Sequence, residues 1–107
     1  MIYKTARFQV KSEALAKCQQ AVRDFISFVQ ANEPSTRLYL SLQDQADPTQ
    51  FLHYFAFDDA AAEERHRTSD GVMQFTAALY PELASHGVTF TDYTLLATTE
   101  AGRHDAG

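Results

Sequence analysis

The sequence predicts a single α+β domain in which a four-stranded antiparallel sheet carries its helices on one face. Some segments alternate polar and apolar residues with period two, which is typical of strands. Between these segments, apolar residues recur at helical spacing. The resulting order of elements is β-α-β-β-α-α-β. With short links and right-handed crossovers, this order closes most simply as a ferredoxin-like fold.

The first strand is predicted over residues 2–11. Its apolar face carries Ile2, Ala6, Phe8 and Val10, with Lys4 as an exception. Ser12 is predicted to cap a long helix that follows, and Pro34 is predicted to end it, because proline disfavours the helical conformation of the residue before it. The apolar stripe of this helix comprises Leu15, Cys18, Val22, Phe25, Ile26 and Val29.

The second and third strands are predicted to form a hairpin. Leu38, Leu40 and Leu42 alternate with polar residues, and the segment 44–49 (DQADPT) has the composition of a turn. The third strand, 50–57, is apolar on both of its faces. Such a strand is expected only where both faces of the sheet are covered.

The junction after the third strand is predicted to present a histidine. Asp58 and Asp59 can cap a short helix over 60–67, because a carboxylate accepts hydrogen bonds from the free N–H groups of a helix start. This helix carries His66. The segment 68–70 then has the composition of a second cap, which begins a third helix.

The last part of the chain is predicted to complete the sheet. Pro81 ends the third helix, and a fourth strand is predicted over 88–97. Residues 98–107 show no periodicity, so we expect a single domain over 1–97 and a flexible C-terminal tail over 98–107.

Composition and charge exclude several classes of function. A net charge of −5 argues against nucleic acid or an anionic membrane as partner. No apolar run is long enough to span a bilayer. The single cysteine, Cys18, excludes an internal disulfide and favours a cytoplasmic location. The four histidines are scattered, and no phosphate loop or metal-binding spacing is present, so we expect no metal and no cofactor.

The predicted sheet leaves one face without helices, and this face includes aromatic residues. An exposed apolar face of this kind usually marks a partner. A second copy of the chain, packed sheet to sheet, would cover it, since twofold dimers are the commonest symmetric assembly.

Two histidines are candidate catalytic residues. His66 could act as a general base because its ordinary pKa lies near neutrality, or it could simply fix two helices through a hydrogen bond. His53 lies on the same strand face as three phenylalanines, where it could contact a ligand or be a satisfied interface histidine. Candidate substrate-binding residues are the ring-bearing side chains Tyr39, Phe51, Tyr54, Phe55 and Phe75.

The segments NEPSTRLY, DPTQFLHY, FDDAAAEERHRTS and LYPEL resemble the antibiotic-biosynthesis-monooxygenase family. The resemblance covers residues 2–97 and implies a dimeric α+β barrel; the family includes proteins assigned as quinol monooxygenases and an autoinducer isomerase. His66 and Ser69 match its histidine and serine. The chain departs from the pattern at Phe55, where many members have glutamate, and at Asp70-Gly71, where many have a second histidine.

The resemblance implies a cofactor-independent monooxygenase acting on a small aromatic, phenolic or quinol substrate. His66 or His53 would accept a proton, and the substrate itself would supply electrons to O₂. The alternative is a non-catalytic dimeric module of the same fold that binds a small hydrophobic or aromatic ligand. The departures at Phe55 and Gly71 favour this alternative.

Overall fold

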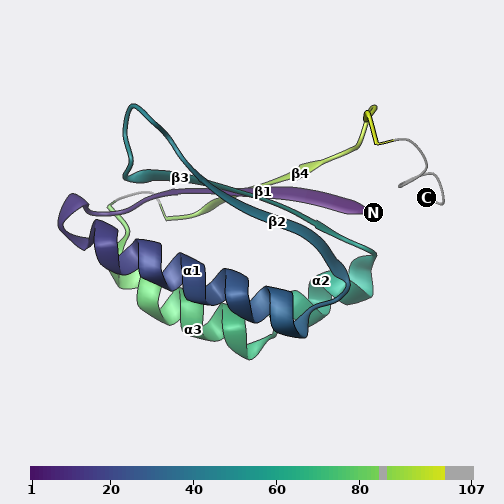
Figure 1. The fold of residues 1–107 in the computed structure, drawn as a ribbon, viewed down its shortest axis with the longest axis horizontal. Coiled ribbons are helices and arrows are strands. Elements are labelled where there is room, and N and C mark those ends of the chain that lie inside the picture. Colours follow the sequence, from purple (N-terminus) through teal and green to yellow (C-terminus); the bar gives the residue numbers. More distant parts are fainter. Residues whose placement is uncertain (85–86, 101–107) are drawn as a thin grey trace.

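The structure is a computed structural model that describes residues 1–84 and 87–100. Its elements follow the predicted order (Figure 1). The strands are β1 (Ile2–Gln9), β2 (Thr36–Gln43), β3 (Gln50–Phe57) and β4 (Thr89–Tyr93). The helices are α1 (Leu15–Asn32), α2 (Ala60–Arg67) and α3 (Asp70–Leu79), with single 3-10 turns at η1 (Ser12–Ala14) and η2 (Tyr80–Glu82).

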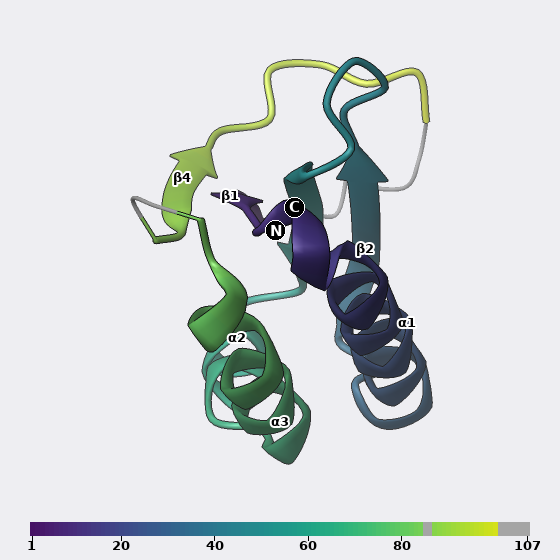
Figure 2. The same cartoon turned by 90° about the vertical axis from the view of Figure 1, so that its left-hand side faces the viewer.

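The four strands form one antiparallel sheet in the order β2-β3-β1-β4. All three helices lie on the same side of this sheet (Figure 2). The predicted ferredoxin-like α+β fold is therefore confirmed, as is the β2–β3 hairpin.

The period-two pattern of β3 determines which side chains face the helices. Phe51, His53, Phe55 and Phe57 are all buried and lie on the helix-facing side. Phe51 packs in one core cluster with Cys18 and Val22 of α1, whereas Phe55 and Phe57 pack in a second cluster with Ala6 of β1 and Ala62 of α2. Burial of each large apolar side chain contributes roughly 1.5–3 kcal/mol before the entropy of ordering is subtracted.

Two predicted caps are confirmed and one is wrong. The Asp59 carboxylate accepts a hydrogen bond from the Ala62 N–H at 2.9 Å, and the Ser69 hydroxyl accepts one from the Val72 N–H at 3.1 Å. Ser12 does not cap α1, because the chain first makes the turn η1, where the Ala14 N–H donates to the Lys11 carbonyl. No side chain caps the start of α1.

The first and last strands of the chain are shorter than predicted. β1 ends at Gln9, after which Val10 makes only an isolated bridge to Leu83. β4 ends at Tyr93, which pairs with Tyr3 near the start of β1, so the following residues find no strand of this chain to pair with. Residues 94–100 have no regular structure, and residues 101–107 of the predicted tail lie outside the described residues.

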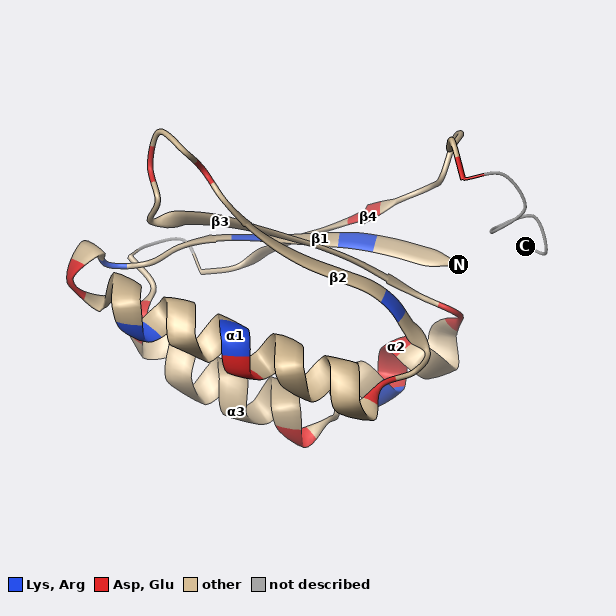
Figure 3. Ribbon diagram, in the orientation of Figure 1, with Lys and Arg blue, Asp and Glu red and all other residues tan. Residues whose placement is uncertain are grey.

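Charged residues lie mainly on the helices and loops, and few of them are on the sheet (Figure 3). Lys4 and Asp92 are two exceptions, and they lie opposite each other on β1 and β4. Within residues 1–84 and 87–100, no helix combines the length and the apolar character needed to cross a membrane.

Candidate functional site

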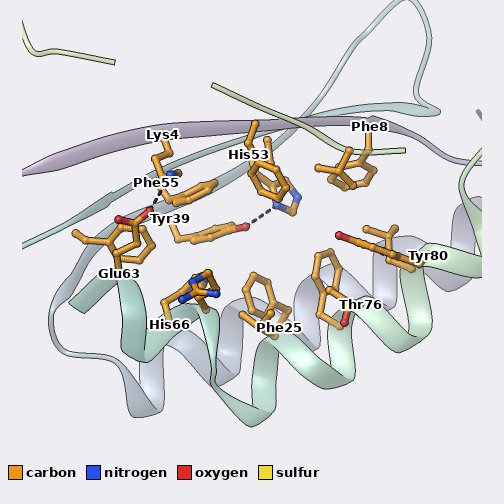
Figure 4. Close-up of a pocket in the computed structure, with 18 residues that line it drawn as sticks. Lys4, Phe8, Phe25, Tyr39, His53, Phe55, Glu63, His66, Thr76 and Tyr80 are labelled. Carbon is orange, nitrogen blue, oxygen red and sulfur yellow. Dashed lines mark hydrogen bonds and ion pairs between the residues drawn. The ribbon is translucent and has the colours of Figure 1, made fainter. Parts of the chain in front are cut away.

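A cavity of about 350 Å³ lies between the sheet and the helices. Its walls are mostly rings, and the residues that form them are Phe8, Phe25, Tyr39, Phe55, Phe57 and Phe75 (Figure 4). Tyr39 stacks on Phe55 with 4.8 Å between ring centroids, and Phe25 stacks on Phe75 with 4.7 Å. Phe90 and Tyr80 also line the cavity and are 60% and 50% exposed, so its mouth opens to solvent between β4 and the end of α3. The space suits a flat apolar ligand.

His53 extends from the centre of β3 into this cavity and is held at both ring nitrogens. The Tyr39 hydroxyl lies 2.8 Å from Nδ1, and the Ser41 hydroxyl lies 2.9 Å from Nε2. Both hydroxyls come from β2, whose register places Ser41 directly opposite His53. A neutral imidazole has one donor and one acceptor nitrogen, and a hydroxyl can either donate or accept. Both ring nitrogens of His53 therefore have a suitable hydrogen-bond partner.

Burial controls the protonation states of His53 and Tyr39. With His53 only 1% exposed and no carboxylate among its hydrogen-bond partners, burial lowers its pKa to about 4. Burial also raises the pKa of the Tyr39 phenol well above its usual value near 10, with a smaller contribution from the charge of Glu33. At neutral pH the cavity therefore contains a neutral imidazole and a neutral phenol at this point.

His66 reaches the same cavity from α2, and its surroundings are different. Its Nδ1 lies 2.7 Å from Oε1 of Glu33, the residue that follows α1. The side chain is 12% exposed, and no described residue is a hydrogen-bond partner of Nε2. His66 is therefore the histidine of this cavity with a ring nitrogen available to a ligand.

Lys4 closes one end of the cavity. Its Nζ lies 2.7 Å from the Glu63 carboxylate and 2.8 Å from the Asp92 carboxylate. Both hydrogen bonds raise the pKa of the Lys4 ammonium group, and the one to Asp92 has the larger effect. Lys4 is the residue that broke the apolar pattern of the first strand in the sequence. Its place on the inner face is explained by carboxylates supplied by α2 and β4.

The antibiotic biosynthesis monooxygenase family model matches residues 1–78, well over half of the chain. The chain belongs to this family. Membership supports a monooxygenase-type function.

Solved structures with this fold come from several bacteria and are provisionally assigned as antibiotic biosynthesis monooxygenases. The protein from Nitrosomonas europaea is 19% identical with a TM-score of 0.81, over 91% of this chain and 100% of that chain. The Caulobacter crescentus protein is 20% identical with a TM-score of 0.78, over 88% and 90%. The Deinococcus radiodurans protein is 24% identical with a TM-score of 0.74, over 92% and 95%. At these identities the likeness shows the fold alone. A search of the curated proteins finds no match.

The structure brings together most of the residues predicted from the sequence. His53, His66, Tyr39, Phe55 and Phe75 all line the one cavity. The alternative prediction for His53 was a hydrogen-bonded histidine in a dimer interface. His53 is indeed hydrogen-bonded at both nitrogens, but it faces the helices of its own chain and not the bare face of the sheet.

Two predicted substrate-binding residues lie elsewhere. Tyr54 is on the opposite face of the sheet, because it is one residue out of phase with its buried neighbours His53 and Phe55. Phe51 is on the inner face but stacks on Phe8 at 5.1 Å within the packed core, and it does not line the cavity. Neither residue therefore lines the cavity that holds the other candidates.

Sequence reasoning missed Lys4 and Glu33. The signal for Glu33 was a carboxylate beside Pro34 at the C-terminal end of α1, where an acidic residue is unfavourable for the helix dipole. Across residues 1–84 and 87–100, no group of three or more His, Cys, Asp or Glu side chains is placed to hold a metal ion.

The two departures from the family pattern have different structural consequences. Phe55 is 4% exposed and forms a wall of the cavity, so a ring stands where many members have a carboxylate. Gly71 is buried against α1, where a Cβ atom would lie only 2.1 Å from Cδ1 of Phe28. A histidine at position 71 is therefore incompatible with the present position of Phe28.

Proposed function

We propose that this family member is a cofactor-independent monooxygenase acting on a small aromatic phenol or quinol bound in the ring-lined cavity. The observation that carries the proposal is Nε2 of His66, which has no hydrogen-bond partner among the described residues and belongs to a mostly ring-lined cavity of about 350 Å³. Ligand sites are typically apolar spaces with a few placed polar groups, and this cavity fits that description.

In the proposed reaction, His66 Nε2 accepts the proton of a substrate hydroxyl. The O–H bond breaks, an N–H bond forms, and the resulting anion is electron-rich enough to reduce O₂. When a quinol becomes a hydroxyquinone, one oxygen atom enters the product and the other leaves as water. The substrate supplies all the electrons, so the protein has to exclude water, orient the ring and hold the proton.

His53 has a positioning role in this proposal. Because both of its ring nitrogens are engaged and its pKa is lowered to about 4, it is a poor proton acceptor at neutral pH. Its hydrogen bond to Tyr39 fixes the phenol ring, which stacks on Phe55 as one wall of the cavity. Phe75 lies on the helix side and completes the space for the substrate ring.

The second candidate function is a non-catalytic module that binds a small aromatic ligand. The observation that favours it is Phe55, a ring in the place where many family members have a carboxylate that could handle protons. Under this reading the cavity would bind a ligand but leave it unchanged.

For the partner, we propose a homodimer formed through the outer face of the sheet. Leu38, Leu40 and Leu42 of β2 are 41%, 41% and 48% exposed, and they lie beside Leu52 and Tyr54 of β3. A contiguous apolar face of this kind is unusual on a monomer, and a second copy would bury it. We also expect the dimer to be cytoplasmic, on the basis of Cys18.

Oxygen consumption with a panel of two- and three-ring quinols tests the proposed activity. The wild type is expected to increase the rate above autoxidation, and His66→Ala to reduce that increase by about 10²–10⁴-fold, the usual contribution of a general base. Met73→Ala, an exposed helix residue that does not line the cavity, is the matched control and should retain the wild-type rate. Tight quinol binding with no oxygen uptake would favour the non-catalytic module.

A further inference from the structure

The two histidines of the cavity have opposite electrostatic surroundings. Among the described residues, the hydrogen-bond partners of His53 are the neutral hydroxyls of Tyr39 and Ser41. His66 instead contacts a carboxylate, Glu33, at 2.7 Å. When two titratable groups of one site have such different surroundings, the difference indicates which of them exchanges protons.

Glu33 is an unusual carboxylate for a structural role. Its side chain is only 9% exposed. Oxygen Oε1 accepts hydrogen bonds from His66 Nδ1 and from the Thr36 hydroxyl at 2.8 Å, whereas Oε2 is buried and has no partner among the described residues. Leaving a buried charged oxygen unpaired destabilises a fold, and such an exception calls for an explanation.

Four aromatic rings, called here the ring cage, lie close to the imidazole. The centroids of Phe57, Phe25, Tyr39 and Phe55 lie 5.1, 5.6, 5.8 and 6.0 Å from the His66 centroid. Aromatic rings within about 6 Å stabilise a cation through their quadrupoles. The carboxylate and the four rings are therefore placed to stabilise the positive charge that the imidazole gains when it accepts a proton.

Glu33 does not touch the substrate cavity. The cavity is lined by His66 but not by Glu33, whereas a separate space of about 130 Å³ behind it is lined by Glu33 but not by His66. The imidazole therefore lies between the two, with Nδ1 toward the carboxylate. Any effect of Glu33 on a bound ligand must pass through His66.

We propose that Glu33 is the positioning residue of a Glu33–His66 dyad. An ionised Glu33 holds the proton of His66 on Nδ1, so Nε2 carries the lone pair that faces the cavity. When Nε2 takes a substrate proton, the resulting imidazolium is stabilised by the carboxylate and by the ring cage. The catalytic part of this inference rests on the proposed function. The position of the proton on His66 in the free protein can be measured without any turnover.

Nitrogen-15 NMR of the histidine rings tests the dyad without any substrate. In the wild type at neutral pH, the His66 resonances, assigned by their loss in His66→Gln, should show a protonated Nδ1 and an unprotonated Nε2. Glu33→Leu should shift His66 to a mixture of both tautomers, and Thr36→Val, which removes only the second hydrogen bond of Oε1, should leave it unchanged. A wild-type spectrum with the proton on Nε2 would overturn the proposal.

Stability and rate measurements on Glu33→Gln separate a functional dyad from a structural one. This variant keeps the side-chain volume and removes the buried charge, so unfolding should need as much urea as in the wild type, or more. With a quinol substrate, kcat should fall at least 10-fold while KM stays within about twofold, because Glu33 does not contact the cavity. A variant that loses stability and keeps kcat would show that the pair serves the fold alone. If no quinol is turned over by the wild type, the proposed function fails, while the NMR result still decides the dyad.

Discussion

The contact between Gly71 and Phe28 makes the sharpest prediction about the packing of this chain. In Gly71→Ala the new Cβ atom would lie 2.1 Å from Cδ1, 2.5 Å from Cε1 and 2.6 Å from Cγ of Phe28. Because Cγ is the root of the ring, rotating the ring about its own axis cannot remove the clash. The whole side chain must move, or α1 and α3 must separate.

The expected cost follows from two opposing effects. Overpacking of this kind costs roughly 1–3 kcal/mol, while replacing a helical glycine by alanine gains roughly 0.4–1 kcal/mol through the unfolded state. The net loss should be about 1–2 kcal/mol. For a domain of this size this lowers the melting temperature by roughly 4–16 °C.

Urea denaturation of a double-mutant cycle checks the cause of this loss. Phe28→Ala should cancel most of the effect of Gly71→Ala, since the clashing ring is gone. Gly87→Ala is the matched control: it has open space around its Cβ but a φ of 66°, so it should cost stability that Phe28→Ala does not restore. A Gly71→Ala protein as stable as the wild type would refute the reasoning.

Two further predictions concern pH and assembly. His53 has a pKa lowered to about 4 in the folded protein against 6.5 unfolded, so its contribution to stability is complete above pH 6.5 and is lost as pH falls toward 4. Between pH 6.5 and pH 5 the free energy of unfolding should drop by about 1.6 kcal/mol through this group. His53→Gln should remove that part of the pH dependence in urea titrations, and an unchanged pH dependence would disprove the assignment. For the proposed dimer, light scattering should give about twice the 12.0 kDa chain mass for the wild type and for Met73→Arg, but the single-chain mass for Leu40→Arg. A monomeric wild type would contradict the proposed interface.

The fold was predictable because local patterns and turn chemistry agreed along the chain. Period two in residues 50–57, the DPT turn and the caps at Asp59 and Ser69 each indicate one element, and their order leaves few topologies. Strand ends were less predictable. β4 ends at Tyr93 because its partner there, Tyr3, lies near the start of β1. That limit is set by the neighbouring strand and not by residues 94–97.

The site was predictable only in part, because it depends on which side chains meet across elements. Alternation within β3 was enough to place His53 with Phe55, and the same parity places Tyr54 on the other face. The pairing of His66 with Glu33 joins residues 33 positions apart, and no local pattern reports it. Lys4 was visible as an anomaly, but its carboxylate partners were not.

The central claim is that His66 removes a proton from a phenol bound in the cavity, and one spectrum tests it most directly. 1-Naphthol is neutral in water at pH 7, and its anion absorbs at longer wavelength. Without oxygen, binding to the wild type is expected to produce the spectrum of the naphtholate, whereas His66→Gln should bind the phenol in its neutral form. Neutral naphthol bound to the wild type, or no binding at all, would contradict the account.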